Sequence, residues 1–497
     1  MVFLQMEQKN QKYIEESYLT LKRGIHEPLA SLNPDPKVVS ALSEVWSLAG
    51  GRRDALGNIS LLGSDPILPT NFKVGTAASV SIGAASLAAL EVWRYRTGRE
   101  QNITLSIRDA AIAFCSEHFT QVNNKAVMQS FWSPASGHFN DKDGNWVQLH
   151  CQYPHLRDGV LRVLECENEP KAVQKAVERW SAAELEFVCR EKGLCVAQVR
   201  SREEWNVHAH AKAIKNLPVI EIIKIGEARP EALPLGRQQP LSDVKVLDLT
   251  KVIAGPVCGR TLASYGANVM RVGAAHLPFL EPLVIDTGLG KKSTFLDLRD
   301  ETDNQKLSEL LEAADIFVQG YRPGAIEKYG FGPESIAQKR PGIIYVTLSA
   351  YGHVGPWSSW RGFDSLVQSA TGIVHEGMVS SNSSKPLPLP CQALDHATGY
   401  FAAFGAMMAL KKKMEEGGSW MVRVSLAQTG NWLNNLGRVE GLQVNKPNRT
   451  EISDLLEKHE SPFGCIEHVR PPENFSETQP FWNSGSVPLG YNKPSWE

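Results

Sequence analysis

The stretch VKVLDLTKVIAGPVCGRTLASYG (residues 244–266) decides the fold. Its first seven residues form an apolar run of strand length, and a Gly-Pro turn then leads into a helical segment. Further apolar strands, separated by helical runs, are expected at 267–273, 293–299, 314–320 and 342–352. Apolar strands that alternate with helices predict a doubly wound, Rossmann-like parallel sheet in an α/β lobe. Ligands of such a sheet bind at the carboxyl ends of the strands.

Four parts are expected along the 497 residues, because a chain of this length exceeds one ordinary core. Residues 1–124 are mainly helical, and 125–238 have the hairpin and amphipathic helices of a small α+β domain. Residues 239–440 form the large α/β lobe, and 441–497 are expected to wrap another domain.

Composition excludes several classes of function. The net charge of −2 gives no bulk electrostatic reason to bind nucleic acid or an anionic membrane. The eight cysteines are scattered without a C-x-x-C pair, so no metal site and no disulfide framework are expected. No run of about 18 uninterrupted apolar residues and no secretory signal are recognised, which favours a cytoplasmic protein without a membrane span.

A second stretch, LPCQALDHATGYFAAFGAMMAL (389–410), places Asp395 at the start of a helix rich in small residues. Two roles remain open for Asp395. It is a suitable helix cap, since Asp is a common choice there. It is also a candidate nucleophile, because the positive end of the helix favours the ionised carboxylate and an exposed carboxylate can react.

Six segments in a fixed order carry a resemblance to a known family. They are VLDLTKVIAGPVCGRTLASYGANVMRV, GKKSTFLDLR, ADIFVQGYRPGAIEKYGFG, RPGIIYVTLSAYGHVGPWSSWRGFDSLVQSATGI, ALDHATGYFAAFGAMMAL and SPFGCIEHVRPPENFSETQPFWNSGSVPLG. Together they resemble the family III CoA-transferases (the CaiB/BaiF family), which include formyl-CoA and carnitine CoA-transferases and α-methylacyl-CoA racemases. The resemblance covers about residues 240–497.

The resemblance implies a reaction and its residues. Asp395 would carry the acyl group as a mixed anhydride and then CoA as an enzyme-bound thioester, and CoA would pass from an acyl-CoA to a small free carboxylic acid. CoA would be a substrate, with no permanently bound cofactor. The resemblance assigns CoA binding to Val252, Ala254, Lys292, Tyr321, Arg322, Gly324 and Lys328.

The first part of the chain resembles the same family in displaced order. Residues 88–107 resemble 408–426, and aligning Leu90 with Leu410 puts Gly75 where Asp395 stands. This predicts a tandem duplication with permuted domain order, in which the first copy has lost its CoA-binding lobe and its carboxylate. Family members are interlocked homodimers, and the permuted order leaves a homodimer and a monomer both open.

Two departures from the family pattern keep other functions open. Gly273 and Ala274 replace the acidic residue that usually follows the second strand, and Ile253 stands where formyl-CoA transferases have Gln, which argues against oxalate or formate as substrates. The alternatives are an α-methylacyl-CoA racemase or CoA-dependent lyase, and a degenerate CoA-binding protein without activity. The wording DHATGYFAAFG favours the transferase.

Overall fold

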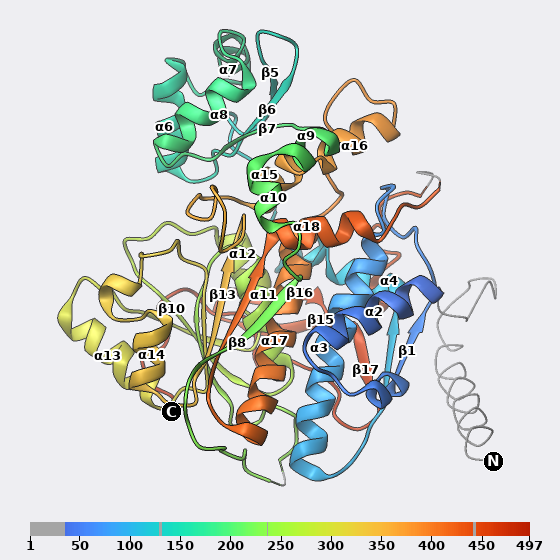
Figure 1. Cartoon of the computed structure of the whole chain (residues 1–497), viewed down its shortest axis with the longest axis vertical. Coiled ribbons are helices and arrows are strands. Elements are labelled where there is room, and N and C mark those ends of the chain that lie inside the picture. The colour runs from blue at the N-terminus through green and yellow to red at the C-terminus, as the bar shows by residue number, and fades with distance from the viewer. Residues whose placement is uncertain (1–34, 129–131, 236, 441–443) are drawn as a thin grey trace.

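The computed structural model describes residues 35–128, 132–235, 237–440 and 444–497, and its centre is a seven-stranded sheet (Figure 1). The strand order is β11-β10-β9-β12-β13-β14-β8. In that order the strands are Lys291–Phe295, Asn268–Gly273, Lys245–Leu249, Ile316–Gln319, Ile344–Ser349, Ser419–Ser425 and Ile220–Gly226. All neighbours pair in parallel except β8, which is antiparallel to β14. The predicted parallel α/β lobe is therefore confirmed.

Each face of the sheet has its own apolar core, because successive strand residues point to opposite faces. Val246, Val269 and Ile316 belong to the core shared with α11 and α17. Leu247, Met270 and Phe317 belong to the core on the side of α13 and α14. These four helices are Ala254–Ser264, Ala393–Glu416, Glu301–Glu312 and Pro333–Lys339, and Figure 1 shows the two pairs on opposite sides of the sheet. The remaining helices of the lobe are α12 (Glu281–Thr287), η2 (Glu327–Tyr329), α15 (Asp364–Ala370), α16 (Ile373–Ser380) and α18 (Leu426–Asn435).

The edge strand β8 comes from the range 125–238 that the sequence assigned to the small domain. Apart from the short strand β4 (Lys125–Ala126), which pairs with β3, the rest of that range forms a separate sheet in the order β5-β6-β7, which Figure 1 shows at the top with its helices. Its elements are β5 (Gly137–Asn140), β6 (Trp146–Leu149), α6 (Pro154–Leu164), α7 (Pro170–Val177), α8 (Ala182–Glu191), β7 (Val196–Gln198), α9 (Arg202–Val207) and α10 (Ala209–Ile214). The range 125–238 thus supplies both a small α+β unit and one strand of the large lobe.

The first part of the chain packs α3 (Val74–Thr97) against α17, and each of these helices has 24 residues. Nearly all of α3 is buried, with Ala, Gly and Ser on every face. It is long and apolar enough to cross a membrane, but the apolar window is entirely buried in the protein, as in a core helix. The other early elements are α2 (Pro36–Leu48), η1 (Arg53–Asn58), β1 (Ile59–Leu62), β2 (Ile103–Ser106), α4 (Ile107–Ala113), α5 (Ser116–Phe119), β3 (Gln121–Val122) and β4 (Lys125–Ala126).

The two copies of the repeat correspond with a shift of one residue from the sequence alignment. The caps of α3 and α17, Lys73 and Gln392, have nearly the same backbone angles (φ −78° and ψ 62°, φ −80° and ψ 62°). Counting three residues from each cap puts Thr76, and not Gly75, at the position of Asp395. The alignment through Leu90 and Leu410 was wrong by one residue, because runs of small residues fix no register. The first copy still has no carboxylate at this position.

The last part of the chain returns to the first copy. Strands β15 (Leu456–Ser461) and β16 (Gly464–Val469) form a hairpin that pairs with β3, and β17 (Glu473–Phe475) pairs with β2. A short helix, η3 (Ser453–Leu455), precedes the hairpin. Beyond β17 the chain reaches the large sheet, where the Asn492 N–H donates to the Ser293 carbonyl at 2.7 Å.

Close approach of α17 to α11 requires glycine at position 399. A Cβ built on Gly399 lies 2.5 Å from the Ala254 carbonyl oxygen and 2.7 Å from Val257 Cβ. The first neighbour is a backbone atom at the start of α11, which does not move without displacing the helix.

We therefore expect Gly399→Ala to destabilise the protein by about 1–3 kcal/mol through overpacking, even though Ala favours a helix. Guanidinium chloride unfolding measures this change. The matched control is Gly57→Ala, because a Cβ at Gly57 meets nothing within 4 Å, and its effect should stay within about 0.5 kcal/mol. Equal unfolding midpoints for the two variants would contradict the packing argument.

Candidate active site

Asp395 lies in the first turn of α17 but does not cap that helix. Its backbone N–H donates to Asp364 Oδ2 at 2.9 Å, and Gln392, the cap residue, makes no side-chain capping bond. The carboxylate that binds the helix start therefore comes from Asp364, on α15. Among the described residues, the Asp395 carboxyl group has no hydrogen-bond partner, and Asp395 is 7% exposed. The capping interpretation of Asp395 was wrong, and its carboxyl group is available for chemistry.

The surroundings of Asp395 are acidic. Burial first, and then the nearby charges of Asp364 and Glu117, raise the pKa of Asp395 well above its usual value. Burial also raises the pKa of Asp364 to about 6, although N–H donors from Asp395 and Gln368 oppose the shift. The sequence predicted an exposed carboxylate kept ionised by the helix end. The structure instead shows a buried carboxyl group whose ionisation is opposed by its neighbours.

The first copy contributes Glu117, from α5, to this cluster. Glu117 Oε2 lies 3.1 Å from Nε2 of His396, the residue after Asp395. Burial acts to raise the pKa of Glu117, but the charge and hydrogen bond of His396 outweigh it and hold that pKa at about 2. Phe114 stacks on the His396 ring with centroids 5.4 Å apart. The first copy, which has no carboxyl group at the equivalent position, therefore forms one wall of the site around Asp395.

The start of α11 lies beside the first turn of α17, because Gly399 contacts the Ala254 carbonyl one turn beyond Asp395. Val252 joins β9 to α11 with φ +70°, a conformation that a β-branched residue rarely adopts. Such strain is typical of functional sites. Ala254 is the first residue of α11, and helix N-termini attract anions. Val252 and Ala254 thus follow β9 at the start of α11, and Ala254 packs against α17 one turn beyond Asp395.

Basic side chains gather where the strand ends of the lobe meet the small domain. Arg271, at the end of β10, is buried, and its Nη1 has no acceptor in the part of the chain that the structure describes. Its charge interacts first with Asp248 of β9, and then with Tyr153 of the small domain and Tyr321 of the lobe. Burial and the charge of Arg271 lower the pKa of Lys251 to about 8. Arg361 interacts electrostatically with both Arg322 and His155.

The other residues predicted for CoA binding divide into two groups. Tyr321, Arg322 and Gly324 follow β12, and Gly324 has φ +78° and is exposed. Lys328 is exposed in η2, with Nζ 4.8 Å from the centroid of the Tyr329 ring. Lys292 is separate from them, because its Nζ donates to the carbonyl oxygens of Trp496 at 3.2 Å and Glu497 at 2.7 Å.

The alternation of β11 explains the position of Lys292. Its neighbour Lys291 points to the opposite face, where its Nζ forms a buried ion pair of 2.8 Å with Asp248 and donates to the Pro256 carbonyl. The structure therefore binds Lys292 to the last two residues of the chain, whereas Arg271 interacts electrostatically with Lys291 and Asp248.

Three residues of the site were not identified from the sequence: Asp364, Glu117 and Arg271. Asp364 belongs to the quoted segment RGFDSLVQ, but nothing in one sequence links it to a helix that begins about 30 residues later. Glu117 lies in the other copy. A basic residue at the end of an apolar strand was the one available signal for Arg271.

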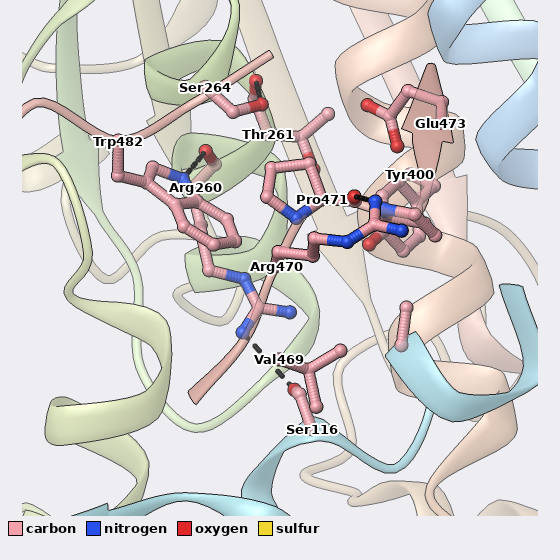
Figure 2. Close-up of a pocket in the computed structure, with 12 residues that line it drawn as sticks. Ser116, Arg260, Thr261, Ser264, Tyr400, Val469, Arg470, Pro471, Glu473 and Trp482 are labelled. Carbon is pink, nitrogen blue, oxygen red and sulfur yellow. Dashed lines mark hydrogen bonds between the residues drawn. The ribbon is translucent and has the colours of Figure 1, made fainter. Parts of the chain in front are cut away.

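A pocket lies farther along α17, beside Tyr400 (Figure 2). Arg260, Arg470, Glu473 and Trp482 line it. Arg260 is paired with Asp286 at 2.9 Å, and Tyr265 Oη donates to Glu473 Oε1 at 2.7 Å. Neither Asp395 nor Arg271 lines this pocket, so it is distinct from the candidate active site.

Comparison with known proteins gives a consistent set of relatives. Residues 241–450 match the family model of CoA-transferase family III. The chain is 29% identical to acetyl-coenzyme A transferase nodX of Hypoxylon pulicicidum, over 80% of this chain and 74% of that protein. It is 34% identical to the probable fatty acyl-CoA transferase Rv3272 of Mycobacterium tuberculosis, over 38% of this chain and 50% of that protein.

The human succinyl-CoA:glutarate CoA-transferase is 32% identical, over 36% of this chain and 43% of that protein. A crystal structure of Rv3272 has 31% identity and a TM-score of 0.36, and the match covers 40% of this chain and 59% of that chain. The chain thus spans about half the length of most of these relatives and about three quarters of one.

The raised pKa of Asp395 has a consequence for stability. Because the folded state holds the proton more tightly than the unfolded state, the free energy of unfolding falls as pH rises above about 4. We expect Asp395→Asn to remove this dependence and to stabilise the protein at pH 7, typically by about 0.5–2 kcal/mol. Below about pH 4 the difference should vanish. Thermal unfolding across this pH range measures both effects.

The matched control is Asp141→Asn, because Asp141 accepts N–H bonds from Ala182, Asp143 and Asn145 that lower its pKa against the effect of burial. Its loss should destabilise the protein at neutral pH, with an effect that fades as the solution becomes acidic. If Asp395→Asn also destabilises the protein at pH 7, the folded state does not raise the pKa of the Asp395 carboxyl group, and the prediction is wrong.

Proposed function

Because this chain belongs to CoA-transferase family III, we propose that it moves CoA from an acyl-CoA to a free carboxylic acid, with Asp395 as the nucleophile. The observation that carries the proposal is the place of the Asp395 carboxyl group. It has no hydrogen-bond partner among the described residues, and it lies in the first turn of α17, the helix that packs through Gly399 against the start of α11.

The reaction proceeds in balanced steps. The ionised Asp395 carboxylate attacks the thioester carbonyl, and the C–S bond breaks to give a mixed anhydride and CoA thiolate. The thiolate attacks the aspartyl carbonyl, which releases the donor acid and leaves an aspartyl-CoA thioester. The acceptor carboxylate then attacks this thioester and displaces the thiolate, which gives a second mixed anhydride. The thiolate attacks the acceptor carbonyl of this anhydride, so that the new acyl-CoA forms and the Asp395 carboxylate is released. The N-terminus of α11 stabilises the negative charge that develops on oxygen.

The basic cluster suits the phosphates of CoA. Arg271 presents a buried guanidinium N–H without an acceptor in the described structure, and a phosphate oxygen supplies such an acceptor. Lys251, Arg322 and Arg361 add positive charge at the same edge. Tyr153 comes from the small domain, so both domains of one chain line the CoA site.

For the acceptor, we propose a short dicarboxylic acid. This proposal rests on the relative named for succinyl-CoA and glutarate and on the number of cationic side chains near the strand ends. A cationic edge favours a second carboxylate on the substrate.

The nucleophile is tested by Asp395→Asn. We expect turnover with succinyl-CoA and a panel of free acids to fall by about 10³-fold or more, while CoA binding, measured by calorimetry, remains. The parent protein incubated with succinyl-CoA should carry an adduct on Asp395 that hydroxylamine removes.

The matched control is Thr76→Ala, which alters the equivalent position of α3 and should keep turnover. Substantial turnover in Asp395→Asn would refute the role of Asp395. Exchange of an α-proton with deuterated water, without acyl transfer, would identify a racemase instead.

The CoA site is tested by two variants with the same change of charge. Arg271→Gln should raise the KM for acyl-CoA about 10- to 100-fold, the loss expected for one charged hydrogen bond. Lys292→Gln should leave KM unchanged, because Lys292 is bound to the carbonyl groups of Trp496 and Glu497. A raised KM in Lys292→Gln together with an unchanged KM in Arg271→Gln would support the sequence-based prediction for Lys292 and refute the assignment of Arg271.

A further inference from the structure

We infer that Asp364 is a positioning residue for Asp395: its carboxylate holds the first turn of α17 from outside the helix, and its charge sets the pH range in which Asp395 reacts. The inference rests on the proposed aspartyl mechanism. It assigns a role to a residue of α15 that lies in sequence far from the helix it binds.

The geometry shows how Asp364 fixes the nucleophile. Oδ2 accepts the backbone N–H of Asp395 at 2.9 Å, and the N–H of Leu394 also donates to this carboxylate. Gln368, one turn later on α15, donates to Oδ1, and its own Oε1 accepts the Leu389 N–H at 2.8 Å. Asp364 and Gln368 thus bind both the helix start and the segment that leads into it. The Asp395 side chain is consequently not drawn back to cap its own helix.

The first copy contains the same arrangement without the nucleophile. Asp65 accepts the N–H of Gly75 at 2.9 Å and of Thr76 at 2.7 Å, which are the equivalents of Leu394 and Asp395. It also accepts the Thr76 hydroxyl at 2.7 Å. An aspartate that binds the first turn is therefore a structural element of both copies. Asp364 in the second copy lies near the carboxyl group of Asp395, whereas Asp65 in the first copy binds Thr76. A comparison of Asp364 with Asp65 therefore distinguishes an effect on the nucleophile from a structural contact at the helix start.

The charges that face Asp395 come from three elements. Asp364 belongs to α15, Glu117 to α5, and His396 to α17 itself. Glu117 is paired with His396 at 3.1 Å. Among the described residues, the Asp364 carboxylate accepts hydrogen bonds from neutral donors, the backbone N–H groups and Gln368, and the charge of His396 also acts on it. The Cys391 thiol, which also lies here, is held in the neutral form by its contact with Cys115 and by burial, which raise its pKa. Of the two carboxylates, Asp364 has the larger effect on the pKa of Asp395, ahead of Glu117.

This charge has two opposed effects on the reaction. It delays ionisation of Asp395 to higher pH, because two like charges at close range disfavour each other. It also makes the ionised carboxylate more basic, and a nucleophile or base works best when its pKa lies near the working pH. Removal of the charge should thus extend activity toward acid while lowering the maximal rate. Loss of a purely structural contact produces only the second change.

The test is Asp364→Asn, with Asp65→Asn as the matched control. Infrared difference spectra report the protonated carboxyl band of Asp395, identified by its loss in Asp395→Asn. We expect Asp364→Asn to move the midpoint of this band to lower pH by at least about one pH unit, to move the acid limb of kcat in the same direction, and to lower the plateau of kcat about 10- to 100-fold. Asp65→Asn should change neither the midpoint nor the acid limb.

Asp364→Ser provides a second variant if Asp364→Asn does not fold, since Ser keeps a short acceptor for the helix N–H without the charge. Equal midpoints in the parent and both Asp364 variants would overturn the inference. So would a midpoint that moves in Glu117→Gln but not in the Asp364 variants. The infrared measurement needs no turnover, so a shifted midpoint in a protein that transfers no CoA would uphold the charge coupling and refute only the proposed reaction.

Discussion

The packing of α17 is the constraint on which the rest of the structure depends. This helix contacts α11 through Gly399, the strands β8 and β14 through Gly405, and α3 along its length. A Cβ on Gly405 lies 2.5 Å from both Ile220 Cδ1 and Val422 Cγ1, so the helix rests almost directly on the sheet. A helix held on three sides is fixed in rotation and in translation. The position of Asp395 is therefore a property of the core and not of a loop.

The fold was largely predictable, because its signals are local. An apolar strand followed by a helix start, repeated along the chain, defines a parallel sheet without knowledge of distant contacts. The strands β9, β10, β12 and β13 lie within the predicted ranges. The edge strand β8 was not assigned to this sheet, since it reaches the sheet from the range of the small domain and runs in the opposite direction. The order of segments in the sequence does not indicate that a strand from the small-domain range joins the large sheet.

The site was less predictable, because its electrostatics arise between elements that are distant in sequence. Asp395 was identified from its motif, but its burial and its acidic neighbours depend on α15 and on the first copy. Lys292 and Lys291 illustrate the same limit within one strand. The two lysines are adjacent and follow Gly290. Only the structure shows that Lys291 is paired with Asp248 and that Lys292 binds the end of the chain. The motif therefore identified Asp395 as a candidate residue, whereas its burial and its raised pKa could be seen only in the structure.

The pairing of α3 with α17 has a consequence for how the protein is made. About 295 residues, 98–392, separate the two helices, so α3 leaves the ribosome long before its main partner exists. α3 is buried on nearly all sides in the folded protein, and contacts at such long sequence separation form slowly. The strands that close over the first copy, β16 and β17, are synthesised later still. The chain therefore passes through a stage in which the mostly apolar helix α3 lacks the partner that covers it, and apolar surface exposed at such a stage favours aggregation.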